Sequence, residues 1–460
     1  MWSVGERLVA LAAMAVLARR SLPLVGDLLA FQADRLGFLT RLAREHGDVA
    51  VFRIGPHRAW LLSHPDHVRD VLVTRASHFR KGPVLQRSRI VLGDGLLTAE
   101  GDVHRHHRRL VQSAFHPDRI KGYAEVMTAQ AAAAAGRWTA AAPVDVHAET
   151  VRMTLTTAGI TLLGTDVDAD VETVERAVAD LLSAYRLAFV PFGWRLQNMP
   201  VGPARRLRRG RASLRELVDD MIVKRRTAAV DAGDLLSALV LADSGDRFSD
   251  AEIRDQAVTL LLAGHETTAN ALAFALHLLA HDADVDGRVC AEVDDVLRGS
   301  LPRPGDVDRL PTCRSVVAEA LRLYPPSWAM GRQAIEDHPV GDHIVPSGDL
   351  VVLPQWVVHR DPRWWPHPDR FDPDRWSDAD ARGRPRWAFF PFGAGVRMCI
   401  GEGFAWTEAV LALASIVQQW RLRPVPQRPL RLDPLITLRP RDGLWLRPEA
   451  RNPATGRAFK

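Results

Sequence analysis

Cysteine is scarce in this chain, whose 460 residues include only Cys290, Cys313 and Cys399. A small, odd number of cysteines spread over a long chain excludes a disulfide framework and indicates a reducing compartment. No two of them are close enough in sequence to suggest a zinc knuckle, and the set cannot hold an iron–sulfur cluster. We therefore expect a cytoplasmic protein in which any cysteine chemistry depends on one thiol.

A strong charge of one sign is also missing, because 60 basic residues against 55 acidic ones leave a net charge of +5. An excess this small does not indicate nucleic-acid binding by itself. The chain also lacks internal repeats and low-complexity linkers, and its apolar and charged fractions, 47% and 25%, are those of an ordinary globular protein. We expect a globular protein without a nucleic-acid partner.

A clear membrane-spanning segment is absent as well. The apolar run Leu8 to Ala18, followed by two arginines, has 11 residues, whereas crossing a bilayer requires about 20. It could be the core of a signal peptide, a surface helix or an edge of the domain, but no clear cleavage site follows. We interpret residues 1–22 as an N-terminal apolar segment of uncertain role, without a firm membrane anchor, and residues 23–460 as one domain.

Residue patterns along the chain predict a mainly α protein with a small β-sheet toward each end. Two β-rich runs between Val49 and His64 are separated by Gly55-Pro56, which is typical of a hairpin. Helical spacing dominates residues 102–324. Short strands are expected in residues 340–353, and a second hairpin in residues 430–446.

One predicted helix, Gln256 to Ala280, is apolar nearly all round and should lie in the interior of the protein. Its middle reads Gly264-His265-Glu266-Thr267-Thr268, although burying an unpaired carboxylate costs several kcal/mol. One reading is a kinked core helix with a satisfied polar pocket. The other is a site at which an acid and a hydroxyl relay protons, with Glu266 connected to solvent and Thr267 holding the hydrogen bond at the reacting atom.

The stretch "FPFGAGVRMCIGEGF", residues 390–404, places Cys399 on a glycine-rich turn before a predicted helix. A thiolate that binds a metal needs nearby positive charge and backbone amides, and glycines let those amides turn toward the sulfur. The helix N-terminus that follows also favours an anion. A single thiolate is sufficient when a macrocycle supplies the remaining ligands of an iron, which predicts a haem site.

The turn around Cys399 resembles the haem-binding signature of the cytochrome P-450 superfamily of haem-thiolate monooxygenases. "AGHETT", residues 263–268, is similar to the oxygen-activating helix motif of that family, and the resemblance extends from about Leu24 to Leu446. It implies the cytochrome P-450 fold, with a haem-binding domain that holds haem b between this helix and the cysteine loop.

The resemblance also assigns roles to individual residues. Cys399 would be the axial metal ligand, and Glu266 and Thr267 would be the catalytic pair that delivers protons to dioxygen. Contacts with the cofactor, including its propionates, would come from residues on several segments: Ala263, His104, Arg108, Arg332, Phe392, Gly393, Arg397 and Gly401. Histidine stands at position 104 where the family usually has tryptophan.

A buried structural triad is implied by "EALR" together with the later "PHPDRF". Glu319 and Arg322, three residues apart, share a helical face, and the resemblance adds Arg370 as the third member. Without the other motifs, an ordinary surface salt bridge would explain Glu319 and Arg322 equally well.

By the same resemblance, the substrate would contact a roomy apolar cavity assembled from separated segments: Leu85, Ile90, Val91, Phe189, Leu260, Trp328, Met330 and Ile436. Electrons would come from external NAD(P)H through a reductase with a ferredoxin or flavodoxin, because the chain has no flavin or iron–sulfur motif. A basic surface that includes Arg105, Arg109, Arg119 and Lys121 would attract such an acidic partner. We expect a monomer.

The implied activity is insertion of one oxygen atom from dioxygen into a hydrophobic small molecule of bacterial secondary metabolism. A terpenoid, a polyketide or macrolactam, and a fatty-acid-like molecule are all compatible substrates, by hydroxylation or epoxidation. Desaturation, ring coupling and peroxide-driven oxidation remain alternatives within the family. A non-catalytic haem sensor or carrier is the alternative outside catalysis.

Overall fold

The computed structural model describes residues 26–164, 173–174, 176–181, 202–241, 248–377 and 383–451. The chain divides into two compact units. The first comprises Met1–Pro83, Ser327–Arg370 and Gly383–Met398, and the second comprises Val84–Pro326, Phe371–Arg382 and Cys399–Lys460.

The first unit is organised around a five-stranded sheet with the strand order β1-β2-β8-β5-β3. Strands β1 (Val49–Ile54) and β2 (His57–Leu62) form an antiparallel hairpin that turns at Gly55, whose φ is +59°. The predicted hairpin is therefore confirmed. The other strands of this unit are β3 (Phe79–Lys81), β5 (Met330–Ala334) and β8 (Leu350–Leu353) in the same sheet, and the separate hairpin β6 (His338–Val340) and β7 (His343–Val345).

Short helices complete the first unit, in which the sheet and its connections share a core that includes Leu62, Phe79 and Phe390. The helical elements are α2 (Leu28–Ala33), α3 (Arg35–His46), α4 (Pro65–Arg69), η1 (Asp70–Thr74), η2 (Ala76–His78), α17 (Gln355–Val358), η8 (Arg386–Ala388) and η9 (Gly395–Arg397).

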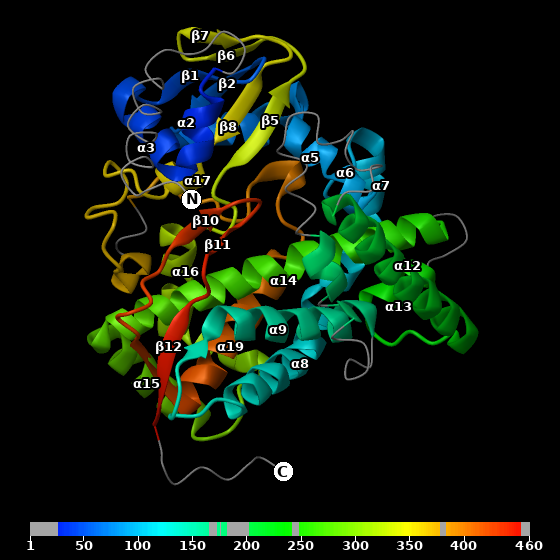
Figure 1. Ribbon diagram of the computed structural model, residues 1–460, viewed down its shortest axis with the longest axis vertical. Coiled ribbons are helices and arrows are strands. Elements are labelled where there is room, and N and C mark those ends of the chain that lie inside the picture. The colour runs from blue at the N-terminus through cyan, green and yellow to red at the C-terminus, as the bar shows by residue number, and fades with distance from the viewer. Residues whose placement is uncertain are drawn as a thin grey trace. The chain divides into compact units, whose positions relative to one another are not determined.

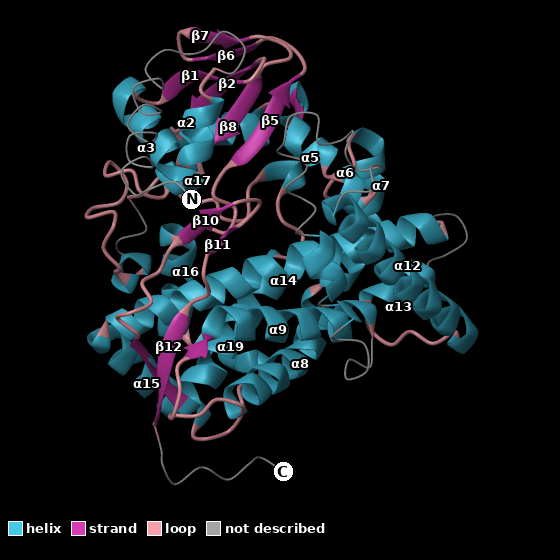
Figure 2. Cartoon of the chain, viewed as in Figure 1, coloured by secondary structure: helices cyan, strands magenta, loops and turns pink. Residues whose placement is uncertain are grey.

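The second unit is dominated by helices (Figures 1 and 2). These are α5 (Pro83–Arg87), which begins at the unit boundary, α6 (Arg89–Leu92), α7 (Gly101–Gln112), η3 (Ser113–Phe115), α8 (Pro117–Gly136), α9 (Val146–Ala158), η4 (Gly159–Leu163), α12 (Gly202–Ala228), α13 (Leu235–Val240), α14 (Asp250–His281), α15 (Ala283–Leu297), η6 (Pro304–Arg309), α16 (Pro311–Leu323), η7 (Pro373–Trp376) and α19 (Glu402–Gln419).

Helix α14, with 32 residues, runs through the second unit with α9 beside it (Figure 1) and also packs against α16 and α19. It begins with a capping box, in which Ser249 and Glu252 each bond to the other's backbone N–H. Most of its residues are buried, as the apolar pattern predicts.

Two small sheets accompany these helices. One has the order β4-β12-β9 and the other is the antiparallel pair β10-β11. Their strands are β4 (Val144–Asp145), β9 (Trp420–Pro424), β10 (Leu432–Pro434), β11 (Leu438–Pro440) and β12 (Trp445–Ala450). The hairpin predicted within residues 430–446 is confirmed by β10 and β11.

The expectation of a mainly α protein with small sheets is therefore confirmed. Among the described residues, no helix is both long enough and apolar enough to cross a membrane. Residues 1–25 lie outside the described part of the chain, so the role of the segment 1–22 stays a prediction.

Candidate functional site

Cys399 lies on the short connection between η9 and α19. Its side chain is accessible to water, yet the surrounding protein desolvates the sulfur, and this burial raises the pKa of the thiol. The backbone N–H of Gly401 and the Arg108 guanidinium both oppose this rise. The sulfur is therefore both accessible and surrounded by protein that disfavours its charged form.

Arg108 and His104 lie one turn apart on α7 and share a face, as the sequence predicts. His104 is buried and Arg108 half-buried. Burial lowers the pKa of Arg108, while the negative charge of a Cys399 thiolate would raise it, which shows that the two groups interact. By contrast, Arg105 and Arg109 on the same helix are exposed. This face of α7 can therefore supply cations and donors near the sulfur.

The polar middle of α14 interrupts an otherwise buried helix. Ala263 is exposed and Thr267 half-buried, although their neighbours on both sides along α14 are largely buried. Thr267 donates its hydroxyl hydrogen to the carbonyl of Ala263 at 3.0 Å, and Thr268 donates to Gly264 at 3.2 Å. The accessibility of Ala263 and Thr267, in the helical unit that also contains the accessible Cys399, fits a site for a bound group.

Glu266 is 7% exposed and accepts a hydrogen bond from Thr437, whose Oγ1 lies 2.9 Å from Glu266 Oε1. Arg439 Nη1 lies 3.8 Å from the same oxygen. The carboxylate is therefore satisfied by residues of β11 and the preceding turn, a pairing that the sequence analysis did not predict.

The buried triad forms with a different third member. Arg322 bonds to both oxygens of Glu319, at 2.8 and 2.7 Å, and both residues are fully buried. The second arginine is Arg375, whose Nε lies 3.1 Å from Glu319 Oε1. Arg370, the expected member, is exposed, so that prediction was wrong. The indole of Trp376 also donates to Glu319, at 3.0 Å.

The remaining candidate cofactor residues belong to the first unit. Arg332 is buried on β5, and Arg397 Nη1 donates to the carbonyl of Phe79 at 3.1 Å. Gly393 has a φ of +71°, and a Cβ there would come within 2.7 Å of Met330. Phe392 is half-buried. Their roles toward a cofactor stay predictions.

The residues predicted to contact substrate are distributed over both units. In the second unit, Val91 and Leu260 belong to one buried core cluster against which Ile90 packs, and Leu85 is half-buried. Ile436, in the turn between β10 and β11, is 39% exposed. In the first unit, Trp328 is buried and Met330 half-buried. Phe189 lies outside the described residues.

Helix α14 also holds the turn between α6 and α7, which directly follows the predicted substrate contacts Ile90 and Val91. Asp255 accepts from the N–H of Asp94 at 2.7 Å, Gln256 accepts from the N–H of Leu96 at 2.9 Å, and Thr259 donates to the carbonyl of Leu92 at 3.2 Å. A Cβ on Gly95 would lie 2.1 Å from Thr259 Oγ1. The polar residues at 255, 256 and 259 in an apolar helix were the available signal for this contact.

A buried acid on α19 was also missed. Glu408 is 1% exposed, and burial raises its pKa to about 8, against the opposing effect of the Thr157 and Thr268 hydroxyls. Its Oε1 has no hydrogen-bond partner in the described part of the chain. Thr268 directly follows the predicted catalytic residue Thr267, so this acid lies beside the polar stretch of α14. A glutamate within the apolar stretch after Gly401 was its sequence signal.

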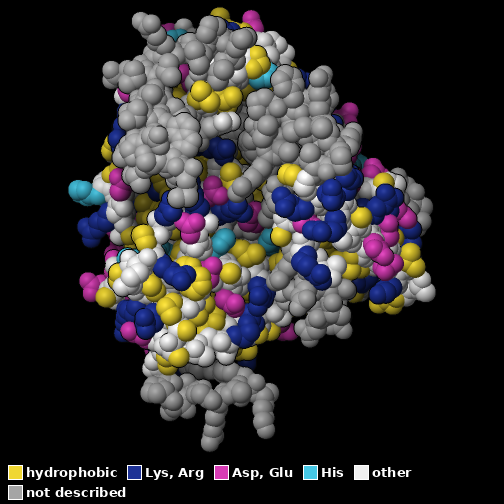
Figure 3. All heavy atoms as spheres, viewed as in Figure 1, with side chains coloured by type: hydrophobic (Ala, Val, Ile, Leu, Met, Phe, Trp, Pro, Cys, Tyr) yellow, Lys and Arg dark blue, Asp and Glu magenta, His cyan; other side chains and the backbone are white. Residues whose placement is uncertain are grey.

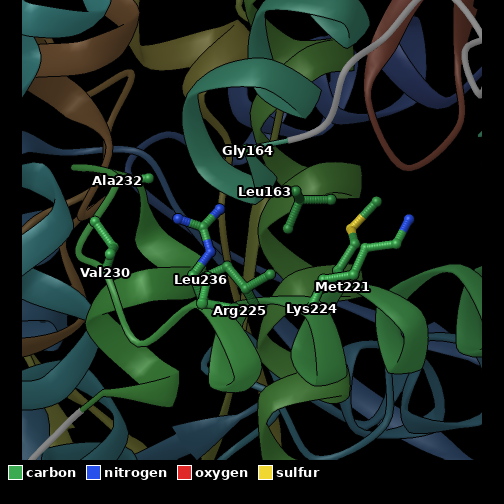
Figure 4. Close-up of a pocket in the computed structure, with 9 residues that line it drawn as sticks. Leu163, Gly164, Met221, Lys224, Arg225, Val230, Ala232 and Leu236 are labelled. Carbon is green, nitrogen blue, oxygen red and sulfur yellow. The ribbon is translucent and has the colours of Figure 1, made fainter.

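A separate pocket of about 300 Å³ lies among η4, α12 and α13 (Figure 4). It is lined by Leu163, Gly164, Met221, Lys224, Arg225, Ala228, Val230, Ala232 and Leu236. Arg225 is already engaged with Asp234 at 2.5 Å and Ser237 at 2.6 Å. The pocket shares no residue with the predicted site.

The predicted basic partner surface is largely paired within the chain. Arg105 pairs with Asp102, Arg119 with Asp231 at 2.8 Å, and Lys121 with Asp118 at 3.3 Å. Exposed basic residues are instead concentrated on α12, and basic side chains gather near this helix in Figure 3. Its exposed arginines include Arg205, Arg206, Arg208, Arg209, Arg211 and Arg215.

Comparisons with known proteins agree with this geometry. The sequence model described as "Cytochrome P450" matches residues 18–446. Cyclooctatin synthase of Streptomyces melanosporofaciens is 41% identical over 91% of this chain and 92% of its own length. Pentalenene oxygenase of Streptomyces avermitilis is 35% identical, over 94% of this chain and 97% of its own.

Solved structures also match this chain in fold. The crystal structure of the cytochrome P450DA haem domain superposes with a TM-score of 0.84 at 30% sequence identity, covering 95% of this chain and 97% of that one. The chain belongs to the cytochrome P450 family. It is a P450 monooxygenase, a class of enzyme that uses haem, dioxygen and electrons from a redox partner to oxidise hydrophobic molecules.

The corrected triad predicts different effects for two neighbouring arginines. Arg375→Met removes a cation from a buried carboxylate and should lower the free energy of unfolding by about 3–5 kcal/mol. Arg370→Met, at an exposed position, should change it by no more than about 0.5 kcal/mol. Urea unfolding of both variants measures the difference, and equal losses would contradict the assignment.

Glu408 predicts a pH-dependent stability with a defined sign. Its folded-state pKa is about 8, raised from 4.5, so unfolding releases a proton between these pH values. This cost is absent below about pH 4.5 and complete above about pH 8, growing by about 1.4 kcal/mol per pH unit in between. Glu408→Gln should therefore gain stability relative to the wild type as pH rises from 5 to 8.

Denaturant midpoints at pH 5, 6.5 and 8 measure this trend. Glu449→Gln, at an exposed strand position, is the matched control and should follow the wild-type curve. A stability difference between Glu408→Gln and the wild type that stays constant with pH would show that Glu408 ionises normally.

Proposed function

We propose that this enzyme hydroxylates a polycyclic terpenoid hydrocarbon or alcohol, with haem b bound through the Cys399 thiolate. The observation that carries the proposal is the placement of the accessible thiol in the same helical unit as the accessible residues Ala263 and Thr267, whose neighbours along α14 are largely buried. Names of relatives supply the substrate class. One is a cyclooctat-9-en-7-ol 5-monooxygenase, 39% identical over 88% of this chain, and another is the pentalenene oxygenase described above.

The residues present fit a haem. A lone thiolate is one ligand of a macrocyclic iron, and the N–H of Gly401 together with Arg108 favours its anionic form. His104 and Arg108 would donate to propionates, as would Arg332 and Arg397, because a guanidinium matches a carboxylate with two parallel donors. Ala263, Phe392 and Gly393 would contact the macrocycle.

The reaction requires protons as well as electrons. Haem, when bound, activates dioxygen with two electrons from the redox partner, so that R–H, O₂, two electrons and two protons give R–OH and H₂O. Glu266 would supply protons to the interior, and Thr267 would hold the hydrogen bond beside the activated oxygen. The buried neighbours of this stretch would exclude bulk water and limit loss of the oxygen as peroxide.

Electrons would come from NAD(P)H through a reductase with a ferredoxin or flavodoxin. Because Arg105, Arg119 and Lys121 already have acidic neighbours, we expect each of them to contribute little to partner affinity. Exposed Arg109, the fourth residue of that predicted surface, stays a proposed cationic contact on α7.

The substrate class follows from the apolar character of the proposed contacts. Leu85, Ile90 and Ile436 are partly accessible hydrophobic side chains, and Leu260 lies on α14 three residues before Ala263. A fused-ring hydrocarbon is uncharged and rigid, so it can fill an apolar site of matching shape without needing a charged partner. Titrating the haem spectrum with terpenoid hydrocarbons and alcohols, then identifying products, tests this class; binding restricted to fatty acids or macrolactams would refute it.

Removal of the thiol tests the cofactor assignment. The reduced, carbon monoxide-bound wild-type protein should show the red-shifted Soret band typical of axial sulfur, and Cys399→Ala should lose it. Cys290→Ala, which removes a buried cysteine, should retain it. Identical spectra for the wild type and Cys399→Ala would contradict the assignment.

Replacement of the Thr267 hydroxyl tests proton delivery. In Thr267→Ala, product formed per NAD(P)H should fall by roughly tenfold or more while peroxide rises, since general acid–base assistance contributes at least this much. Thr267→Ser keeps the hydroxyl and should largely restore product formation. Unchanged product formation and peroxide release in Thr267→Ala would exclude the proposed role.

A further inference from the structure

The proposed proton donor Glu266 is held by the hairpin β10–β11, not by its own helix. The Thr437 hydroxyl donates to Glu266 Oε1 at 2.9 Å, and Arg439 Nη1 lies 3.8 Å from that oxygen. Glu266 and Thr437 are 7% and 8% exposed. A hydrogen bond between groups this well buried is protected from competition with water.

Behind Thr437, a chain of side chains continues to α9. Asn270 Nδ2 donates to Thr437 Oγ1 at 3.4 Å, and His147 Nε2 lies 2.8 Å from Asn270 Oδ1. Burial lowers the pKa of His147, which favours a neutral ring that donates from Nε2. Each donor then points toward the next acceptor, and Glu266 is the final acceptor.

The hairpin is itself firmly placed within the second unit. Asp433 and Arg439 are paired across its two strands, and their side chains lie 3.5 Å apart. The N–H of Leu438 donates to the carbonyl of Pro326 at 2.9 Å. The positions of Thr437 and Arg439 are therefore determined by backbone pairing, so that they can fix the Glu266 carboxylate.

Glu266 and Thr267 are adjacent on α14, and adjacent helical side chains do not face each other. Thr267 instead bonds to Ala263, at 3.0 Å, while the Glu266 carboxylate is turned to the hairpin. Transfer of a proton from Glu266 toward Thr267 therefore requires the carboxylate to leave the hairpin or to act through water. The strength of the hairpin contact would control that step.

We propose that Thr437 and Arg439 are positioning residues for Glu266, which hold its carboxylate in the position from which it delivers protons. This inference rests on the proposed function, in which Glu266 is the proton donor. The charged and titratable groups facing Glu266 are Arg439 and its partner Asp433 on the hairpin, His147 on α9 and His265 on α14.

A double-mutant cycle on the unfolding of the haem-loaded enzyme tests the contact independently of turnover. Thr437→Val should lower the folding equilibrium constant about fivefold when Glu266 is present. It should have little effect in a Glu266→Met background, because the acceptor is absent. Additive effects of the two substitutions would refute the contact.

Product formed per NAD(P)H tests its consequence. Arg439→Leu and Thr437→Val each leave the carboxylate without one of its fixed partners, so product formed per NAD(P)H should fall at least about twofold while peroxide rises. Arg439→Lys and Thr437→Ser keep the charge or the hydroxyl and should restore most of the product. Arg441→Leu, an exposed arginine of the same region, is the matched control and should leave product formation unchanged.

Product formation by Arg439→Leu and Thr437→Val equal to that of Arg441→Leu would overturn the proposal. Failure of the proposed function is recognised separately, because a wild-type protein without the sulfur-type carbon monoxide spectrum would not be a haem-thiolate enzyme. The double-mutant cycle would still report on the hairpin contact in that protein.

Discussion

Helix α14 is buried on nearly every side, yet its middle, residues 265–268, places a histidine, a carboxylate and two threonines in an apolar interior. Unpaired polar groups in such a position cost several kcal/mol, so the neighbouring elements must present partners. Thr154 donates to the carbonyl of His265 at 2.9 Å, Thr150 to that of Ala269 at 3.2 Å, and the β10–β11 hairpin supplies Thr437 to Glu266. The arrangement of the second unit depends on meeting this requirement.

The same constraint explains why the proposed reaction centre combines accessible and buried residues. Cys399, Ala263 and Thr267 are at least partly accessible, whereas Glu266, Glu319 and Glu408 are buried. The three buried carboxyl groups differ in the neighbours that compensate for the loss of water. Glu319 has two arginines, and Glu266 has a hydroxyl and an arginine. Glu408, with two hydroxyls and no cation among the residues that the structure describes, has a pKa raised to about 8.

Cations of the predicted partner surface are paired with acids of the same chain, which reduces the positive charge that this surface presents. Arg119 and Lys121 suggested attraction of an acidic protein, but each lies beside an aspartate. A cluster of basic residues in the sequence predicts too strong a positive surface potential when acids from distant segments pack beside those residues. Asp231, which pairs with Arg119, is such an acid. Sequence spacing reveals local pairs such as Lys121 with Asp118 but not these distant ones.

Local sequence patterns predict the mainly α class, the buried helix around residues 256–280, the hairpins near each end and the lone thiol before a helix. These features follow from local periodicity, turn residues and short motifs, which act within a few residues. By contrast, packing places Arg375 rather than Arg370 beside Glu319, brings Thr437 to Glu266, and leaves Glu408 without a cation among the described residues. The partners lie 56 residues from Glu319 and 171 residues from Glu266, and packing alone brings such residues into hydrogen-bond distance.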